Sequence, residues 1–461
     1  MHAKVIPLRR LPKAMHLFDY AVPDDLRAEI KPGQLVTIPF RTGDIFGLVY
    51  NLEQPSGPTT LKEIKKIMFT EPLVTHNYLN FLTKISSLYG ISLATLAKMG
   101  LPPLQKRKLE SDSIYPSPIR NSVDPQYSSV YPHHIIYHLY HTNSEHKNFL
   151  LKYANKKTVI VVPEIQHIKE VFNLLPKEIQ EQTIIWHSHL TQKEQFSRWF
   201  SIRNEEKQIV IGTRGALLLP LTNFENIIID YEHDQNHKHF DQSPRFHVKD
   251  VADLYCKLSG TRHIEMSFSP SCASYYFVSK KKWDSQNFQF SQSKSNSDKP
   301  IIVNTTQEPG NFKPLPSIIE EEIRKLTGES ELGKDIVLII NRRGFATLVL
   351  CKDCGHQEKC PNCQLSLIYN SDKNNLTCNY CKTHSQLPLI CPQCHSPFLR
   401  LRGVGTESIQ KYLRDISDIA NKYEVIRIEK DTKSLIFSHR KVPEVPKIIV
   451  GTEAALPHIR W

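Results

Sequence analysis

Eight of the ten cysteines lie between residues 351 and 394, with the spacing of metal ligands. They form four Cys-x-x-Cys pairs. The two-residue turn within a pair can place both sulfurs about 2.3 Å from one tetrahedral zinc ion, so four pairs can complete two sites. The candidate ligands are Cys351, Cys354, Cys360, Cys363, Cys378, Cys381, Cys391 and Cys394. Because four thiolates leave no open coordination position, both Zn²⁺ ions are predicted to be structural.

Disulfides and a redox motif are the alternatives for these cysteines. Disulfides are typical of exported proteins, and no hydrophobic signal segment follows Met1. A redox Cys-x-x-Cys is expected singly, beside a βαβ unit. We therefore favour zinc. The remaining Cys256 and Cys272 lie among apolar residues and are predicted to be core side chains.

The composition indicates a multi-domain protein with a polyanionic partner. The 461 residues contain 59 Lys plus Arg and 47 Asp plus Glu, for a net charge of +12. This excess favours nucleic acid, and a merely well-solvated basic surface is the alternative. No apolar run approaches the roughly 20 residues that a membrane span needs. We expect a cytoplasmic protein without membrane contact.

Hydrophobic patterning divides the chain into regions. Short alternating runs such as QLVTIPF and FGLVYNL indicate a small β-rich domain. The runs TVIVVP, TIIWHS, QIVIGT, NIIIDY and HIEMSF alternate with helical stretches, which is typical of a parallel α/β sheet. The predicted boundaries are 1–100 for the β-rich domain, 101–130 for a linker, 131–280 for an α/β lobe, 281–300 for a polar linker, 301–350 for the start of a second lobe, 351–394 for the zinc insertion and 395–461 for the remainder of that lobe.

Several motifs together resemble the primosomal protein N′ family, the PriA-type replication-restart DNA helicases of superfamily 2. They are VVPE (161–164), VIGTRGALL (210–218), DYEHD (230–234), SPRFHVKDVA (243–252), NRRGFA (341–346), GTES (405–408) and the eight cysteines. The resemblance implies an α/β multi-domain fold. The implied fold has a small β-rich DNA-binding domain, a RecA-like helicase lobe, and a partial second lobe that carries the two-zinc insertion. The family's winged-helix domain has almost no room in 101–130.

The family's pattern also assigns site residues. It pairs Cys351 and Cys354 with Cys391 and Cys394 on one zinc, and the nested Cys360, Cys363, Cys378 and Cys381 on the other. In the domain that binds a DNA 3′ end, the matching residues are Phe18, Asp19, Tyr20 and Lys65. An aromatic face can stack on a terminal base, a carboxylate can accept a hydrogen bond from the base's amino group, and a lysine can neutralise the phosphate. An ordinary strand with core aromatics is the alternative. Arg41 stands where the family usually has glycine.

The ATPase motifs depart from the family's pattern. Aligned on Lys147, the phosphate loop becomes HTNSEHKN (141–148), which keeps the lysine but none of the glycines that let backbone amides wrap phosphates. Another match to the motif, GESELGKD (328–335), follows a helix and precedes a strand, the reverse of the required order. We therefore predict that ATP and Mg²⁺ are not cofactors.

The acidic motif is altered as well. In the family's motif a magnesium-binding acid is followed directly by the glutamate that orients water, but here Tyr231 follows Asp230. Glu232 comes one residue late. Because neighbouring residues on a strand point to opposite faces, Glu232 is not on the face of position 231, where the glutamate is expected. His233 follows it. SFSPS (267–271) replaces the family's SATPS, after Met266 where glycine is usual. The chain also ends before the segment with the family's arginine finger. Lys147, Asp230, Glu232 and His233 are thus interpreted as remnants.

The sequence predicts a DNA-binding protein of replication restart that recognises forks or 3′ ends without hydrolysing ATP. Its expected partners are DNA, replication-restart and helicase-loading proteins, and single-strand DNA-binding protein. An active ATP-dependent 3′–5′ DNA helicase is one alternative. A zinc-ribbon RNA-binding factor is the other.

Overall fold

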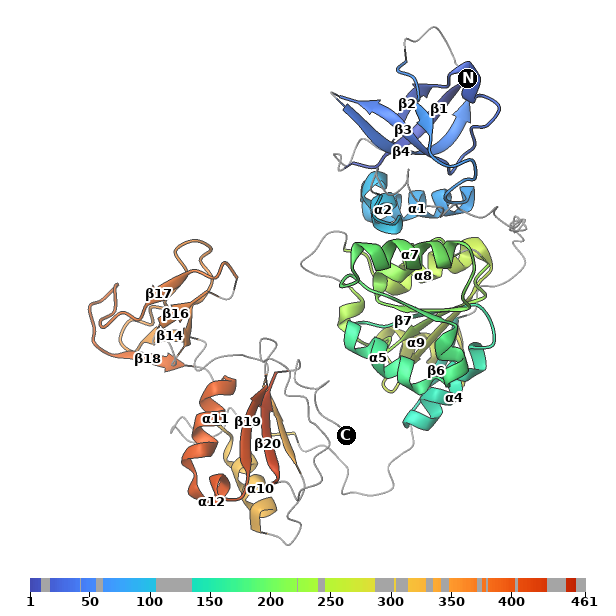
Figure 1. Cartoon of the computed structure of the whole chain (residues 1–461). Helices are drawn as coiled ribbons and strands as arrows, with labels where there is room; N and C mark the ends of the chain where they lie inside the picture. Colours follow the sequence, from blue (N-terminus) through green and yellow to red (C-terminus); the bar gives the residue numbers. More distant parts are fainter. Residues whose placement is uncertain are drawn as a thin grey trace. The chain divides into compact units, whose positions relative to one another are not determined.

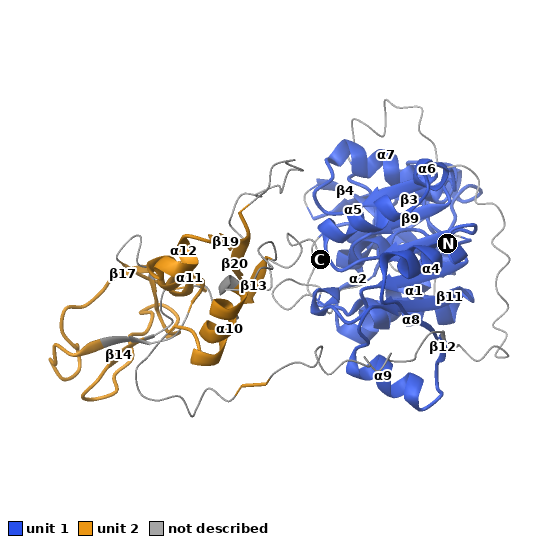
Figure 2. Ribbon diagram, turned by 90° about the horizontal axis from the view of Figure 1, so that it is seen from below, with its two compact units in different colours: residues 1–292 blue, residues 293–461 orange. Residues whose placement is uncertain are grey.

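The computed structural model places most of the chain in two compact units, residues 1–292 and 293–461 (Figure 2). The residues that it describes are 1–9, 17–41, 43–54, 61–104, 135–221, 223–238, 245–286, 302–303, 314–328, 335–340, 348–370, 375–378, 380–402, 405–428 and 445–452. Within these ranges, none of the helices combines the length and the apolarity that crossing a bilayer requires. Most of the two predicted linkers, the motif NRRGFA and residues 453–461 lie outside the described residues.

The first unit begins with an antiparallel sheet, in which Figure 1 labels β1 to β4. Its strand order is β2-β1-β4-β3-β5. Alternating apolar residues such as Val36 and Ile38 face a core that also contains Tyr20 and Val49. The strands are β1 (His2–Pro7), β2 (Phe18–Ala21), β3 (Leu35–Phe40), β4 (Gly43–Glu53) and β5 (Lys66–Ile67), with a 3₁₀ turn at Asp24–Leu26. The predicted β-rich domain is confirmed.

Two helices, α1 (His76–Tyr89) and α2 (Leu93–Gly100), follow this sheet. Gly90 ends α1 in the left-handed conformation with φ 59°. Gly100 lies close against its neighbours, since a Cβ there would be 2.4 Å from the carbonyl oxygen of Leu218. Its own carbonyl accepts a hydrogen bond from Trp199 Nε1 at 2.7 Å. These contacts join the N-terminal helices to the lobe that follows.

That lobe is a seven-stranded sheet of order β12-β6-β11-β10-β7-β9-β8, in which all neighbours are parallel. Its strands are β6 (Ile135–Leu139), β7 (Thr158–Val161), β8 (Thr183–Trp186), β9 (Ile209–Gly212), β10 (Asn226–Asp230), β11 (Arg262–Ser267) and β12 (Asp284–Gln286). Its helices are α4 (Asn143–Tyr153), α5 (Ile165–Leu174), α6 (Lys177–Glu181), α7 (Gln192–Arg203), α8 (Val248–Ser259) and α9 (Cys272–Ser279), with 3₁₀ turns at Arg214–Leu218 and Gln235–His237. All five predicted strands are present.

The second unit has a small parallel sheet of order β13-β20-β19 and a separate zinc insertion. The sheet comprises β13 (Ile336–Ile339), β19 (Glu424–Ile428) and β20 (Lys447–Gly451), with helices α10 (Ser317–Gly328), α11 (Thr406–Asp415) and α12 (Ser417–Ala420). The insertion contains β14 (Leu348–Cys351) paired with β18 (Leu399–Arg402), and β15 (Ile368–Asn370), β16 (Asn375–Thr377) and β17 (His384–Gln386). It lies between β13 and β19 as predicted. Helix α10 ends at Gly328 before β13, so the rejected phosphate-loop motif does join a helix to a strand.

Candidate functional sites

The eight cysteines gather in two clusters of four. Within each cluster all four sulfurs lie within 4.8 Å of one another. One cluster contains Cys351, Cys354, Cys391 and Cys394, and the other contains Cys360, Cys363, Cys378 and Cys381. The closest sulfur pairs are 3.3 to 3.8 Å apart, near the roughly 3.8 Å that four Zn–S bonds of 2.3 Å impose on a tetrahedron. The clusters therefore fit two structural zinc ions, in the nested arrangement that the family resemblance implied.

All four Cys-x-x-Cys pairs adopt the same backbone turn. The residue after each second cysteine has positive φ, and its amide donates to the carbonyl of the first cysteine at 2.9 to 3.1 Å. These residues are Gly355, Gln364, Lys382 and His395. The first cysteine's own amide closes each turn by donating to a carbonyl five residues later. Three of the four turns thus hold a side chain in a conformation costing about 1–2 kcal/mol, which a tightly bound zinc readily offsets.

The remaining cysteines differ from each other. Cys256 is buried in the core of the first unit, as predicted. Cys272 is exposed, so its prediction as a core residue was wrong. The reason is that Ser274 and Val278 form the buried side of α9, and Cys272 begins the helix on its open side.

At the edge of the lobe where β6 meets α4, the helix N-terminus is occupied by the protein's own side chains. Thr142 and Glu145 form a capping box. Glu145 Oε2 accepts hydrogen bonds from the amides of His141 at 2.7 Å and Thr142 at 3.2 Å, and these bonds lower the pKa of Glu145. The amide of Glu145 donates in turn to Thr142 Oγ1. A carboxylate therefore takes amide donors that an approaching phosphate would need.

The connection from β6 to α4 is short. Only residues 140–142 separate the end of the strand from the first helical residue, Asn143. A GxxxxGK phosphate loop occupies more residues than this between strand and helix. Lys147 lies in the second turn of α4 and is exposed, and it makes no hydrogen bond or ion pair with the residues that the structure describes.

Asp230 ends β10 completely buried, with both carboxylate oxygens engaged. Its Oδ2 accepts from His146 Nε2 at 2.7 Å, and its Oδ1 accepts from Tyr140 Oη at 3.2 Å and from the amide of Tyr231 at 2.9 Å. The rings of His146 and Tyr140 stack 4.1 Å apart. A magnesium ion needs carboxylate oxygens and room for several waters. Here imidazole and phenol groups surround the carboxylate instead.

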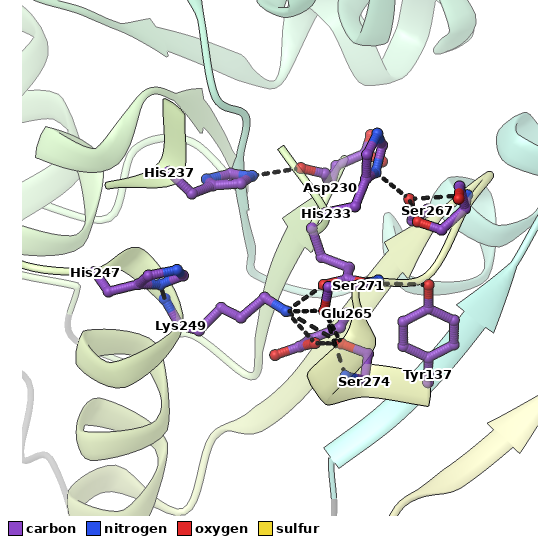
Figure 3. Close-up of polar contacts among 12 residues, drawn as sticks. Tyr137, Asp230, His233, His237, His247, Lys249, Glu265, Ser267, Ser271 and Ser274 are labelled. Atoms are coloured by element: carbon purple, nitrogen blue, oxygen red, sulfur yellow. Dashed lines mark hydrogen bonds and ion pairs between the residues drawn. The ribbon is translucent and has the colours of Figure 1, made fainter. Parts of the chain in front are cut away.

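Glu232 belongs to a different network. Tyr231 has φ 52° and directs the chain away from the strand. Glu232 then accepts from Tyr137 Oη at 3.1 Å and from the amide of Ser271 at 2.8 Å, and pairs with Lys249 Nζ. Figure 3 shows the side chain of Lys249 reaching this group of residues. Glu232 is thus the partner of a partly buried lysine, and none of its described contacts is with Asp230.

Lys249 also contacts a second buried carboxylate, Glu265, at 3.2 Å. Burial, together with the nearby charge of Glu232, raises the pKa of Glu265 to about 7. Lys249 and its hydrogen bonds keep the pKa of Glu232 below its ordinary value in spite of burial. The three side chains therefore share one positive and one to two negative charges in the lobe interior.

His233, the last of the predicted remnants, contacts Ser267 at the start of SFSPS through Nδ1 (Figure 3). Two contacts were not predicted: the capping box at the N-terminus of α4 and the hydrogen bond between His146 and Asp230. Thr142-x-x-Glu145 is a local capping-box pattern that the sequence does contain. The bonds of His146 and Lys249 join residues far apart in the chain, for which the sequence offers no local signal.

The predicted DNA-contacting residues lie on and near β2. Phe18 packs edge-on against Phe40 with ring centroids 5.4 Å apart, whereas Tyr20 is buried and donates to the carbonyl of Pro39. Asp19 faces the other side of the sheet and pairs with Lys4 at 3.3 Å. Strand alternation therefore separates Asp19 from the two aromatic rings.

Lys65 and Arg41 lie outside β2, near the strands β3 and β4. Lys65 is exposed and forms an ion pair of 2.8 Å with Asp44, which lies opposite Pro39 in the sheet. Arg41 adopts φ 54°, so the position where the family usually has glycine does require the left-handed conformation.

Comparisons with known proteins agree with these features. The model of the PriA 3′ DNA-binding domain matches residues 5–102, and that of a double zinc ribbon matches residues 358–409. Replication restart protein PriA of Bacillus subtilis is 29% identical over 287 residues, 62% of this chain and 35% of that protein. PriA of Synechocystis is 30% identical over 314 residues, covering 65% and 37%. PriA of Rickettsia prowazekii is 27% identical over 461 residues, covering 92% and 66%.

Among solved structures, the C-terminal domain of the DEAD-box protein Dbp5 matches 32% of this chain and 82% of its own at 14% identity. Its TM-score is 0.22, too low to identify the fold by itself.

The chain combines a RecA-like parallel lobe with an N-terminal antiparallel domain and two four-cysteine zinc sites. These features define a multi-domain α/β, zinc-binding class of protein. Within that class, the chain is a homologue of the replication restart protein PriA. The chain spans only slightly more than a third of the Bacillus and Synechocystis proteins.

Proposed function

We propose that this PriA homologue binds forks and 3′ ends of DNA during replication restart and recruits replication proteins, without hydrolysing ATP. The match of residues 5–102 to the 3′ DNA-binding domain carries the first part of the proposal. The net charge of +12 supports a polyanionic ligand.

In this proposal the exposed edge of Phe18 and the ammonium group of Lys65 contact the terminal nucleotide. Phe18 is half-buried, so a base can stack on the part of its ring that Phe40 leaves open. Among the described residues Lys65 forms one ion pair, with the exposed Asp44, and a phosphate can replace that partner at little cost. Tyr20 supports the backbone at Pro39 and stacks on no base, because it is only 4% exposed.

The absence of ATP hydrolysis rests on two contacts of α4. Glu145 places a negative charge and its own hydrogen bonds at the helix N-terminus, where a phosphate loop binds its anion. His146 engages the carboxylate that would hold magnesium. Together these two contacts occupy the amides that would bind a phosphate and the carboxylate that would bind magnesium. Both contacts are formed by the protein's own side chains.

Recruitment of partner proteins is assigned to the zinc insertion. Several large apolar side chains of this insertion are exposed, among them Tyr380, Leu389 and Phe398. Exposed apolar groups on a rigid, metal-stabilised module are suited to protein contacts. Helicase-loading and other replication-restart proteins and single-strand DNA-binding protein are the proposed partners.

End recognition predicts a dependence on the terminal hydroxyl. We expect a 3′-tailed fork to bind more tightly than the same fork blocked with a 3′ phosphate, and both to bind more tightly than blunt duplex. Phe18→Ala should weaken fork binding by about 1–3 kcal/mol, the range for loss of one stacked base. Fluorescence anisotropy at two salt concentrations measures these affinities.

Lys66→Ala is the matched control for Lys65→Ala. Lys66 is also exposed and adjacent in sequence, but it takes no part in the ion pair with Asp44. Only Lys65→Ala should reduce the preference for the free hydroxyl. Equal binding to fork and blunt duplex would contradict end recognition, and structured RNA outcompeting the fork would favour an RNA-binding factor.

A further inference from the structure

Helix α9 carries an exposed group of aromatic and basic side chains that the proposed 3′-end site does not include. We propose that this α9 platform, defined as Tyr275, Tyr276 and Lys280–Lys282, binds single-stranded DNA away from any 3′ end. The inference rests on the proposed function, because it takes DNA as the ligand, and it adds a second point of contact on the lobe.

Packing of α9 on the sheet leaves its tyrosines in solvent. Ser274 and Val278, four residues apart, form the buried side of the helix. Tyr275 and Tyr276 fall on the other side and are 48% and 51% exposed. These two adjacent, half-exposed tyrosines are not part of the core, and a base can stack on ring surface that is exposed to solvent.

The lysines are held in a defined turn at the end of the helix. The amides of Lys281 and Lys282 donate to the carbonyls of Val278 and Phe277, both at 2.9 Å. Lys281 has φ 54°, a conformation that glycine adopts without strain and lysine does not. Strained residues of this kind are concentrated at functional positions.

Trp283 anchors the end of this turn. Its ring stacks on Phe277 with centroids 4.9 Å apart and packs against buried Tyr137, Leu139 and Val278. The strand β12 that follows pairs with β6. The three lysines are therefore held between a helix and a strand of the sheet, and their positions do not depend on a ligand.

The charge of the platform is not neutralised within the described part of the chain. Lys280, Lys281 and Lys282 are all exposed and form no ion pair with any described residue. Lys282 Nζ lies 5.9 Å from the ring centroid of Tyr276 and 5.7 Å from that of Phe277. A positive charge thus lies beside an exposed aromatic face, as it would to hold a phosphate whose base stacks on the ring.

Single-stranded DNA fits this combination better than other polyanions. Stacking on the tyrosines requires bases that are not already paired and stacked, which excludes a duplex. The attraction between lysines and the C-terminal end of a helix explains the charge alone, but it does not explain two exposed tyrosines. The spacing of ring and ammonium suits a nucleotide, which supplies both a base and a phosphate.

A closed circular single-stranded oligonucleotide tests the platform, because it has no 3′ end. The wild-type protein should bind it, and the triple variant Lys280→Gln/Lys281→Gln/Lys282→Gln should reduce the slope of log affinity against log salt by about 2, or roughly 0.7 for each lost phosphate contact. Tyr275→Ser/Tyr276→Ser should lower affinity by about tenfold or more. A triple variant of exposed lysines elsewhere, Lys84→Gln/Lys169→Gln/Lys193→Gln, loses the same charge and should retain the slope.

The outcomes separate this inference from the proposed function. Phe18→Ala should leave binding of the circle unchanged, and the α9 variants should keep the preference for a free 3′ hydroxyl. Failure of the wild-type protein to bind the circle while it still binds the 3′-tailed fork would overturn the platform alone. Equal losses in both triple variants would also overturn it, as would binding of phosphatidylserine vesicles in place of the circle. Unchanged urea midpoints establish that the variants fold.

Discussion

Purified protein is expected to contain two zinc ions per chain, and removal of either site should have the largest effect of any change considered for this molecule. Structural zinc sites in small modules contribute an apparent 10–16 kcal/mol of binding free energy at neutral pH. Each set of four sulfurs here is closed and already has the spacing of a zinc tetrahedron. Metal analysis in a buffer without chelators measures the stoichiometry.

The nesting of the two sites predicts unequal effects of single substitutions. Cys351→Ser should lose the outer zinc and retain the inner one, because Cys360 and Cys378 lie in their own small core with Val349, Leu367 and Leu376. Cys360→Ser should lose the inner zinc and also weaken the outer one, since the outer site must then close a longer flexible loop. The control Cys272→Ser changes an exposed cysteine outside both clusters and should keep two zincs. One zinc or none in the wild-type protein would refute the assignment.

Lys249→Met is expected to destabilise the first unit by about 3–5 kcal/mol. The substitution leaves Glu232 and Glu265 buried without a cation, and an unpaired buried charge has a cost of this size. The control on the same helix is Lys257→Met, which removes an exposed pair with Asp253 and should cost less than about 1 kcal/mol. Urea unfolding followed by circular dichroism compares the two, and similar losses would show that the buried network contributes little.

The same network predicts how stability changes with pH. The pKa of Glu265 is raised to about 7 in the folded protein, so the proton it binds stabilises the fold below the ordinary pKa of 4.5. This contribution is lost as the pH rises through 7. The lowered pKa of Glu232 acts in the opposite direction and is lost on acidification. Glu265→Gln mimics the protonated acid and should remove the decline in stability between about pH 5 and 8.

The sequence was informative wherever structure depends on short-range patterns. Apolar runs such as NIIIDY predicted the parallel strands, since a strand buried on both faces needs continuous apolar residues. Paired cysteines predicted the metal clusters because two ligands come from one turn. The absence of glycines before TVIVVP indicated a changed phosphate loop, and the structure adds that only three residues connect β6 to α4.

Contacts between distant residues could not be predicted in the same way. His146 meets Asp230 only because α4 and β10 are brought together by the sheet, and Lys249 meets Glu232 and Glu265 from three different elements. A helix pattern also does not state which side faces the core. For that reason Cys272 was assigned to the wrong side of α9, and the exposure of Tyr275 and Tyr276 was not predicted.

ATP turnover measured on a saturating 3′-tailed fork is the most direct test of binding without hydrolysis. The fork concentration is first set by anisotropy so that all protein is bound, and phosphate release is then followed with excess ATP and Mg²⁺. We expect no release above the rate without protein, because Glu145 occupies the phosphate-binding amides and His146 occupies the Asp230 carboxylate. Fork-stimulated turnover that is abolished by Lys147→Ala or Asp230→Ala would contradict the proposal and identify the protein as an active helicase-type ATPase.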